Sequence, residues 1–297
     1  MQKWKIYGLL ACVIGLAIAS VLVSYLQARV FVYSPQEKRA GPRYDPGDYG
    51  LEYESLALAT QDGLELAAWY IPAQNRAAVI VVHGYKNTRA DVLAIAEKLA
   101  RHGYGVLMMD LRAHGESDGE TLSMGLYEVL DIQAASDYLR QRPDVDAERI
   151  GAVGISMGGS IVLLSAAQNP HLRAVVSESA FASLEDEVPA ATANTGLPFF
   201  LAPLIQRFAE QAVGFTSADV SAVNHIAAIS PRPVLILQGG RDLTVSPDSG
   251  QRLFDAAGEP RQLWFEPDLG HCTFPYDRPE EYERRIAAFF DQYLLGK

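Results

Sequence analysis

Short, almost wholly apolar runs alternate with amphipathic segments along the chain from residue 77 onward. Between two of these runs Val92, Ile95 and Leu99 share one helical face, and residues 126–139 predict another helix. The apolar runs predict buried strands at residues 77–82, 104–110, 149–155, 172–177, 233–239 and 262–267. Strands that are apolar on both faces and alternate with helices are typical of a parallel sheet, so the predicted fold class is α/β, with helices on both faces.

Two segments of this region depart from the alternation. Strand-like runs flank Asp62 and Gly63, a pair that favours a tight turn, so a β-hairpin is expected near the start of the domain. Between Phe181 and Ser230 the alternation stops, and several prolines interrupt the segment. We therefore expect one domain at residues 51–297, with a cap inserted at about 181–230.

The N-terminal part of the chain has a different pattern. Residues 6–26 carry no charge and, as a helix, extend about 30 Å, the thickness of a bilayer core. Residues 27–50 combine proline, glycine and charge, as a linker does. This predicts a transmembrane anchor at 6–26 and a linker at 27–50.

Two alternatives remain for the apolar run. Ala17 and Ala19 fit the cleavage site of a secretory signal peptide, and Cys12 fits that of a lipoprotein. Either cleavage would leave an apolar tail at the N-terminus of the mature protein, so an uncleaved anchor is favoured. Basic residues flank the run on both sides, so charge does not set its orientation. A short anchor before a large domain favours a location of that domain outside the cytoplasm.

Composition limits the classes of function that the chain can have. Of 297 residues 49% are hydrophobic, which is enough for a large core and excludes a disordered chain. The net charge is −11, and it is −14 beyond residue 30, so no nucleic-acid partner is expected. Cys12 and Cys272 are far apart in the chain, and neither a zinc-type ligand cluster nor a phosphate-binding loop occurs. We expect no disulfide, metal or cofactor.

One motif points to catalysis. Residues 154–158 read Gly-Ile-Ser-Met-Gly, between a predicted strand and an apolar helical run. In a nucleophile elbow a serine lies on such a tight strand-to-helix turn, where glycines leave room for the backbone. We therefore predict that Ser156 is a nucleophile; the alternative is a helix-capping serine.

A serine hydroxyl needs a base and a group that orients the base. Asp242 follows one predicted strand and His271 the next, which gives the chain order Ser, acid, His. Glu178 is an alternative acid, and Asp268 is too close to His271 in sequence to be the first choice. We predict a triad of Ser156, Asp242 and His271.

Acyl transfer also needs donors for an oxyanion. The backbone N–H groups of Met157, after the nucleophile, and of Tyr85, on the loop after residues 77–82, are the predicted donors. The other five histidines, including His83 and His114 at strand ends, and the thiol of Cys272 are expected to be structural.

With these motifs in place, residues 51–295 resemble the α/β-hydrolase superfamily. The stretches "VVHGYKNTRADVLAIAEKLARHGYGVLMMDLRAHGESDG", "VGISMGG" and "SPRPVLILQGGRDLTVSP" are similar to those of membrane-associated serine hydrolases of the Bem46 type. Ala113 stands where relatives often have glycine. The resemblance implies the same triad and the same two oxyanion donors.

The expected activity is hydrolysis of a carboxylic ester or thioester through an acyl-serine intermediate. The apolar segment "LPFFLAPL" beside a membrane anchor suggests a lipid-like small-molecule acyl substrate. Two alternatives stay open: a serine peptidase on the same fold, and a non-catalytic, membrane-anchored binding protein that uses the cap as a docking surface.

Overall fold

The computed structural model describes residues 2–297, and within them a single eight-stranded sheet has the order β1-β2-β4-β3-β5-β6-β7-β8. Strands β3 to β8 are parallel, whereas β1 and β2 form an antiparallel hairpin that continues antiparallel onto β4. The strands are β1 (Glu54–Ala59), β2 (Glu65–Ile71), β3 (Ala78–Val82), β4 (Gly105–Met109), β5 (Ile150–Ile155), β6 (Leu172–Glu178), β7 (Val234–Gly239) and β8 (Arg261–Glu266). The α/β prediction, the six parallel strands and the hairpin are confirmed.

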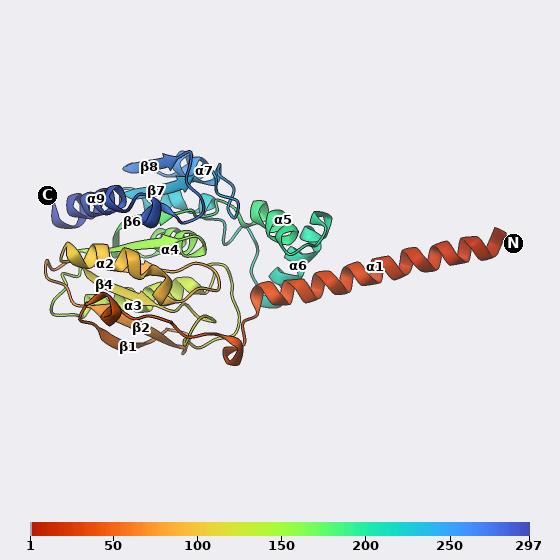
Figure 1. The fold of residues 1–297 in the computed structure, drawn as a ribbon, viewed down its shortest axis with the longest axis horizontal. Helices are drawn as coiled ribbons and strands as arrows, with labels where there is room; N and C mark the ends of the chain where they lie inside the picture. Colours follow the sequence, from red (N-terminus) through yellow and green to blue (C-terminus); the bar gives the residue numbers. More distant parts are fainter. Residues whose placement is uncertain (1) are drawn as a thin grey trace.

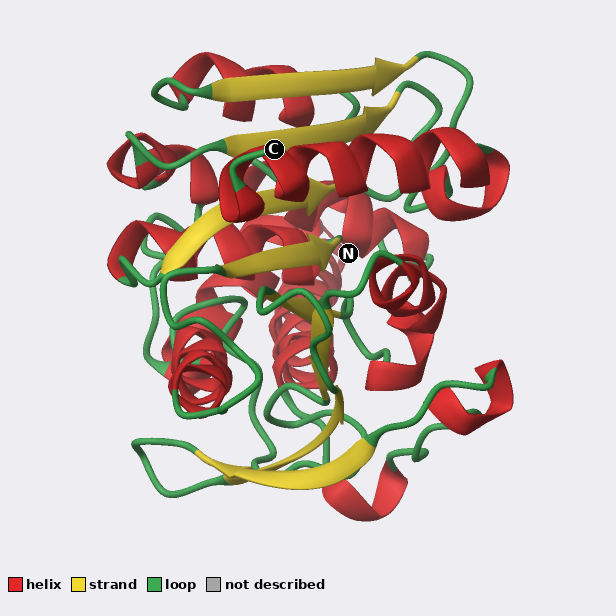
Figure 2. Cartoon of the chain, turned by 90° about the vertical axis from the view of Figure 1, so that its left-hand side faces the viewer, coloured by secondary structure: helices red, strands yellow, loops and turns green. Residues whose placement is uncertain are grey.

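Helices cover both faces of this sheet (Figure 2). Alternate residues of the central strands explain this: Val79 and Val81 pack with α2 (Leu93–Arg101) and α9 (Pro279–Phe290). Ile80 and Val82 face α3 (Glu128–Arg140), α4 (Met157–Gln168) and α7 (Ser249–Ala256). Shorter helical turns are η3 (Arg89–Val92), α8 (Phe274–Asp277) and η7 (Asp291–Leu295). Burial on both faces accounts for the uninterrupted apolar character of the strands.

The residues between β6 and β7 form a helical layer beside the carboxyl ends of the strands (Figure 1). Its elements are α5 (Leu184–Asn194), η4 (Phe199–Leu201), α6 (Ala202–Val213), η5 (Ala222–Asn224) and η6 (Ile226–Ile229). Helices α5 and α6 pack on each other, and η5 and η6 pack against α4. This segment lies where the sequence places the cap.

The N-terminal helix α1 (Gln2–Val32) is 31 residues long, which corresponds to about 46 Å. Most of it projects away from the domain, and its large apolar side chains are exposed (Figure 1). The last turns instead pack against α6, where Ala28 and Val32 are buried with Ile205 and Ala209. The helix therefore continues through the first six residues assigned to the linker, because burial against α6 stabilises them.

Residues 33–53 run along the body of the domain. They contain the short turns η1 (Gln36–Lys38) and η2 (Pro46–Tyr49). The N–H of Ser34 donates to the carbonyl of Glu120, and the Arg39 guanidinium donates to the carbonyls of His114 and Ser117. The segment between α1 and β1 is thus bound to the domain over much of its length.

Candidate active site

Ser156 lies between the last residue of β5 and the first residue of α4. Its φ of 54° and ψ of −124° are rare for a residue with a side chain and mark a strained turn. A β-carbon on Gly154 would lie 2.1 Å from the carbonyl oxygen of Gly158, and one on Gly158 would lie 2.4 Å from that of His83. The expectation that glycines make room for this turn is confirmed. The chain forms a sharp elbow there and presents the Ser156 hydroxyl at the carboxyl ends of the parallel strands.

His271 and Asp242 lie on loops that follow neighbouring strands. Asp242 comes after β7 and His271 after β8, so the parallel sheet brings both to the edge where Ser156 lies. His271 Nε2 is 2.9 Å from Ser156 Oγ, and His271 Nδ1 is 2.7 Å from Asp242 Oδ2. The structure therefore joins the three predicted residues in one hydrogen-bonded line.

The Asp242 carboxylate is fully buried and held in place by the backbone. Its Oδ1 accepts hydrogen bonds from the N–H groups of Thr244 and Val245, each at 2.8 Å. Its Oδ2 faces His271 Nδ1, and because an ionised carboxylate can only accept a hydrogen bond, Nδ1 is the protonated nitrogen. The lone pair of Nε2 is then directed at the serine hydroxyl. In this arrangement the imidazole is oriented as an acceptor for the hydroxyl proton.

The loop after β3 approaches the serine closely. A β-carbon on Gly84 would lie 3.2 Å from Ser156 Cβ, so only glycine lets the backbone at residues 84–85 come this near without displacement. Met157 is the first residue of α4, and the first N–H groups of a helix have no partner inside the helix. The positions of Tyr85 and Met157 beside Ser156 fit the predicted oxyanion donors, whose role stays a prediction.

A narrow apolar cavity of about 170 Å³ opens at Ser156. It is lined by the elbow, by cap residues of α5 and α6, and by the end of α1, including Met157, Val188, Ile205, Phe31 and Val32. Sequence analysis missed the contribution of α1. Because α1 is apolar on all sides, no periodicity in its sequence distinguishes a face that contacts the cavity.

One carboxylate, that of Glu187, lies among these cavity walls. It is buried and accepts hydrogen bonds from the N–H of Ser246 at 3.3 Å and from the hydroxyl of Ser249 at 3.4 Å. Burial raises the pKa of the Glu187 carboxyl. Its oxygen atoms therefore contact the β7–α7 region.

The alternative acids have other surroundings. Glu178 is fully buried at the end of β6, and burial raises its pKa to about 8. Its backbone carbonyl accepts the Ser156 N–H at 2.8 Å, while the carboxyl group makes no hydrogen bond to His271 within residues 2–297. Asp268 pairs with Arg278 at 2.8 Å. Of the three candidate acids, Asp242 is the one that contacts His271.

The surroundings of His83 and Cys272 fit the structural roles that the sequence predicts for them. His83 Nδ1 bonds the Gly84 carbonyl, and its Nε2 accepts the N–H of Leu111. Burial raises the pKa of the Cys272 thiol well above its ordinary value, which keeps the thiol neutral. Across residues 2–297 no group of three or more His, Cys, Asp or Glu side chains is placed to hold a metal ion.

Comparisons with known proteins agree with this fold. Residues 73–213 match the family model described as serine aminopeptidase, S33. The chain is 31% identical to the uncharacterised protein YfhR of Escherichia coli over 90% of this chain and 89% of that protein. It is 25% identical to protein bem46 of Schizosaccharomyces pombe over 87% and 83% of the two chains. The esterase Pf2001 of Pyrococcus furiosus superposes with a TM-score of 0.76 at 26% identity, over 89% and 98%.

These relationships define the class of protein as a hydrolase built on the α/β-hydrolase fold. Within that superfamily the chain belongs to the Bem46 type.

Proposed function

We propose that the chain is a membrane-anchored serine hydrolase that cleaves carboxylic esters or thioesters through an acyl-serine intermediate. The observation that carries the proposal is the hydrogen-bonded line from Ser156 through His271 to Asp242. The esterase Pf2001 among similar structures supports the same chemistry. No metal or cofactor enters this mechanism.

In the first half-reaction Ser156 Oγ attacks the acyl carbonyl carbon while its proton passes to His271 Nε2. Asp242 stabilises the imidazolium that forms, and the N–H groups of Tyr85 and Met157 donate to the oxyanion. When the carbonyl re-forms, the bond to the leaving oxygen or sulfur breaks, and His271 returns the proton to that atom. Water, deprotonated by His271, then hydrolyses the acyl-serine and regenerates the free hydroxyl.

The substrate class follows from the walls of the cavity. An apolar cavity of about 170 Å³ matches an acyl chain better than a polar group. Two further features favour a substrate taken from a lipid phase: the apolar helix α1 ends in the cavity wall, and Phe199 and Phe200 at the cap surface are 70% and 66% exposed. We propose lipid-like acyl esters as the natural class.

Peptidase activity is the second candidate because the matching family model is described as a serine aminopeptidase. An aminopeptidase needs an anionic group for the free α-amine of its substrate. Glu187 is the acidic residue of the cavity lining, and its carboxylate already accepts hydrogen bonds from Ser246 and Ser249. The predominantly apolar lining of the cavity favours esters over peptides.

A substrate panel tests this choice. The purified full chain is assayed with p-nitrophenyl esters of increasing acyl length and with aminoacyl p-nitroanilides, each beside Ser156→Ala. We expect hydrolysis of the esters, lost in the variant, and little release from the anilides. Faster anilide than ester turnover would establish the peptidase, and full activity of Ser156→Ala would contradict both. A cellular function that survives Ser156→Ala but not cap deletion would establish the non-catalytic binding protein.

Membrane attachment through α1 is also part of the proposal. The helix is long and apolar enough to cross a bilayer, and a signal sequence passes the same test. Intact mass measurement on protein extracted from membranes separates these cases. We expect the mass of the uncleaved chain in the membrane fraction. The mass of a chain that starts after Ala19 would identify a signal peptide. Protease accessibility of the domain in sealed vesicles tests the predicted location outside the cytoplasm.

A further inference from the structure

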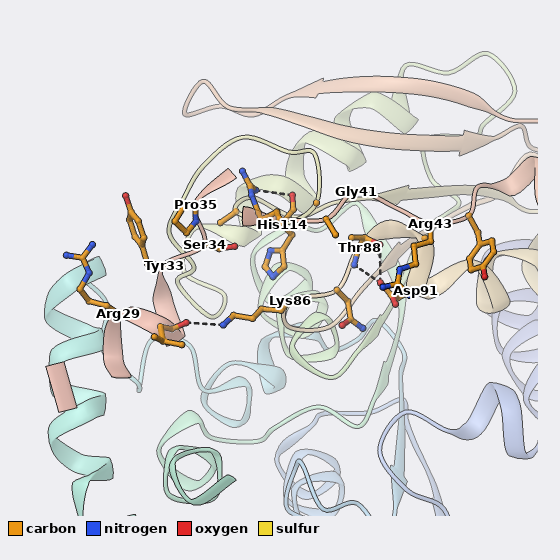
Figure 3. A pocket seen from close by; sticks show the side chains of 18 of the residues that line it. Arg29, Tyr33, Ser34, Pro35, Gly41, Arg43, Lys86, Thr88, Asp91 and His114 are labelled. Atoms are coloured by element: carbon orange, nitrogen blue, oxygen red, sulfur yellow. Dashed lines mark hydrogen bonds between the residues drawn. The ribbon is translucent and has the colours of Figure 1, made fainter. Parts of the chain in front are cut away.

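A second and larger cavity lies at the base of α1. It is a groove of about 980 Å³ between the last turns of α1, residues 33–44 and the loop that follows β3 (Figure 3). Four cationic side chains line it: Arg29, Arg39, Arg43 and Lys86. It shares no lining residue with the cavity at Ser156, although the two are separated only by adjacent residues of α1 and of the 85–86 loop.

The protein balances the positive charge of this groove only in part. Asp110, Glu120, Asp118 and Glu37 act on Arg39 from a distance, without an ion pair. None of the four side chains forms an ion pair with Asp or Glu in the part of the chain that the structure describes. Asp91 is the acidic residue in the lining, and its Oδ2 already accepts from the N–H and the hydroxyl of Thr88, at 2.7 and 3.0 Å. A concentration of cations in a domain with a net charge of −14 beyond residue 30 needs a separate explanation.

Two of the cations have donors available beyond their contacts with the protein. Arg39 uses Nη1 for two backbone carbonyls, while its Nε and Nη2 are buried and have no partner. Lys86 Nζ donates to the carbonyl of Val30 at 3.0 Å, which engages one of its three N–H bonds (Figure 3). Burial lowers the pKa of both side chains, since the charged form loses hydration. An anion with several oxygen atoms would supply acceptors for such donors.

The α1 wall of the groove, which carries Arg29, also has exposed apolar side chains. Leu26 and Val30 of α1 line it, and each is 53% exposed. They belong to the helix that lies in the bilayer under the proposed function, so the cations lie where that helix leaves the hydrocarbon. Apolar surface directly beside clustered cations matches a molecule with an acyl chain and an anionic head group.

We infer that this groove binds the phosphate head group of an anionic phospholipid in the leaflet next to the domain. The bound lipid holds the base of α1 at the bilayer surface. It is distinct from the substrate at Ser156. The inference rests on the membrane position of α1 in the proposed function and does not depend on catalysis.

The experiment measures lipid binding to the full chain in an uncharged detergent. Radiolabelled phosphatidylglycerol is titrated onto the purified protein by scintillation proximity, with phosphatidylcholine as the zwitterionic lipid and inorganic phosphate as a competitor. The test variant is Arg29→Gln with Arg43→Gln, because both side chains are exposed and their loss leaves the core intact. The matched control, Arg140→Gln with Arg173→Gln, removes the same charge from two exposed arginines outside the groove.

We expect phosphatidylglycerol to bind more tightly than phosphatidylcholine. The groove variant should lower the affinity for phosphatidylglycerol by about fivefold for each arginine replaced. The control variant should bind like the wild type. Equal binding of the two lipids, or equal weakening by the two variants, would overturn the inference. Inorganic phosphate that binds as tightly as the lipid would identify a free-phosphate site and also overturn it.

Activity toward a soluble ester separates this inference from the proposed function. We expect the groove variant to keep wild-type hydrolysis and Ser156→Ala to keep wild-type lipid binding. An inactive wild type that still shows the lipid preference would leave the groove inference standing while the proposed hydrolase fails.

Discussion

The phenol of Tyr85 donates a hydrogen bond to the backbone carbonyl of Phe31 at 2.8 Å. This contact joins the loop that carries one predicted oxyanion donor to the end of the N-terminal helix. Phe31 also lines the cavity at Ser156, and its neighbours Ala28 and Val32 are buried against α6. The last turns of α1 are therefore part of the hydrolase domain as well as of the proposed anchor.

Two N-terminal truncations should consequently behave differently. Removal of residues 2–20 keeps the packing of α1 on α6 and should leave ester hydrolysis within about twofold of the full chain. Removal of residues 2–33 exposes Ile205 and Ala209 and opens the cavity wall, and we expect kcat/KM for long-chain esters to fall by at least about tenfold. Equal activity of the two truncated proteins would show that α1 plays no part in the site.

The acid of the triad can be tested by paired substitutions. Asp242→Asn removes the carboxylate that orients His271 and should lower kcat by about 10⁴-fold, because the imidazole then favours the wrong tautomer. Glu178→Gln is the matched control, since a carboxyl with a pKa of about 8 is largely neutral at pH 7 and the amide has the same shape. Initial rates on one p-nitrophenyl ester measure both. A larger loss from Glu178→Gln than from Asp242→Asn would reverse the assignment.

Glycine substitutions test the packing of the elbow. In Gly158→Ala the new methyl group would lie 2.4 and 2.6 Å from the carbonyl oxygens of His83 and Val82, which are backbone atoms of the central strand and its exit. We expect a loss of several kcal/mol in the free energy of unfolding, or no folded protein. Gly270→Ala is the control, because its methyl group would lie 3.7 Å from Thr273 Cγ2, an ordinary contact. Urea denaturation followed by circular dichroism compares the two, and similar stabilities would contradict the elbow geometry.

Acid should destabilise the domain through the buried pair His83 and His114, whose rings lie 4.9 Å apart. Burial lowers the pKa of His83 from 6.5 to about 4 and that of His114 to about 3. The unfolded chain binds these protons near pH 6.5 and the folded chain does not. The free energy of unfolding should therefore fall as the pH drops from about 6.5 to 4, by at most about 1.4 kcal/mol per pH unit for each histidine.

Urea titrations between pH 4 and 7 measure this slope. His83→Gln should reduce it, and His171→Gln, which leaves the buried pair intact, is the matched control. A slope that is unchanged in His83→Gln would show that this pair does not couple protonation to folding.

The parallel strands and the positions of Ser156, Asp242 and His271 were predictable because local pattern and topology determine them. A run such as residues 150–155 is apolar throughout since both faces of its strand are covered, and residues at the carboxyl ends of parallel strands converge at one edge. The contact of α1 with the cap was not predictable. It depends on which side of a uniformly apolar helix meets Ile205, and a uniform surface carries no such information.

The basic groove escaped prediction for a related reason. Arg29, Arg43 and Lys86 are far apart in sequence, and each is unremarkable in its own segment. They come together only because residues 33–44 run back along the domain beside the 86–91 loop.

Labelling with a fluorophosphonate probe tests the central claim most directly, because the probe phosphonylates a serine only when a base has activated its hydroxyl. Trypsin releases Ser156 in the peptide of residues 150–173, in which Ser160 and Ser165 serve as internal controls. We predict a phosphonate adduct on Ser156, found by fragment-ion mass spectrometry and absent from Ser156→Ala. A folded wild-type chain without an adduct, or with the adduct on Ser160 or Ser165, would contradict the assignment of Ser156 as the nucleophile.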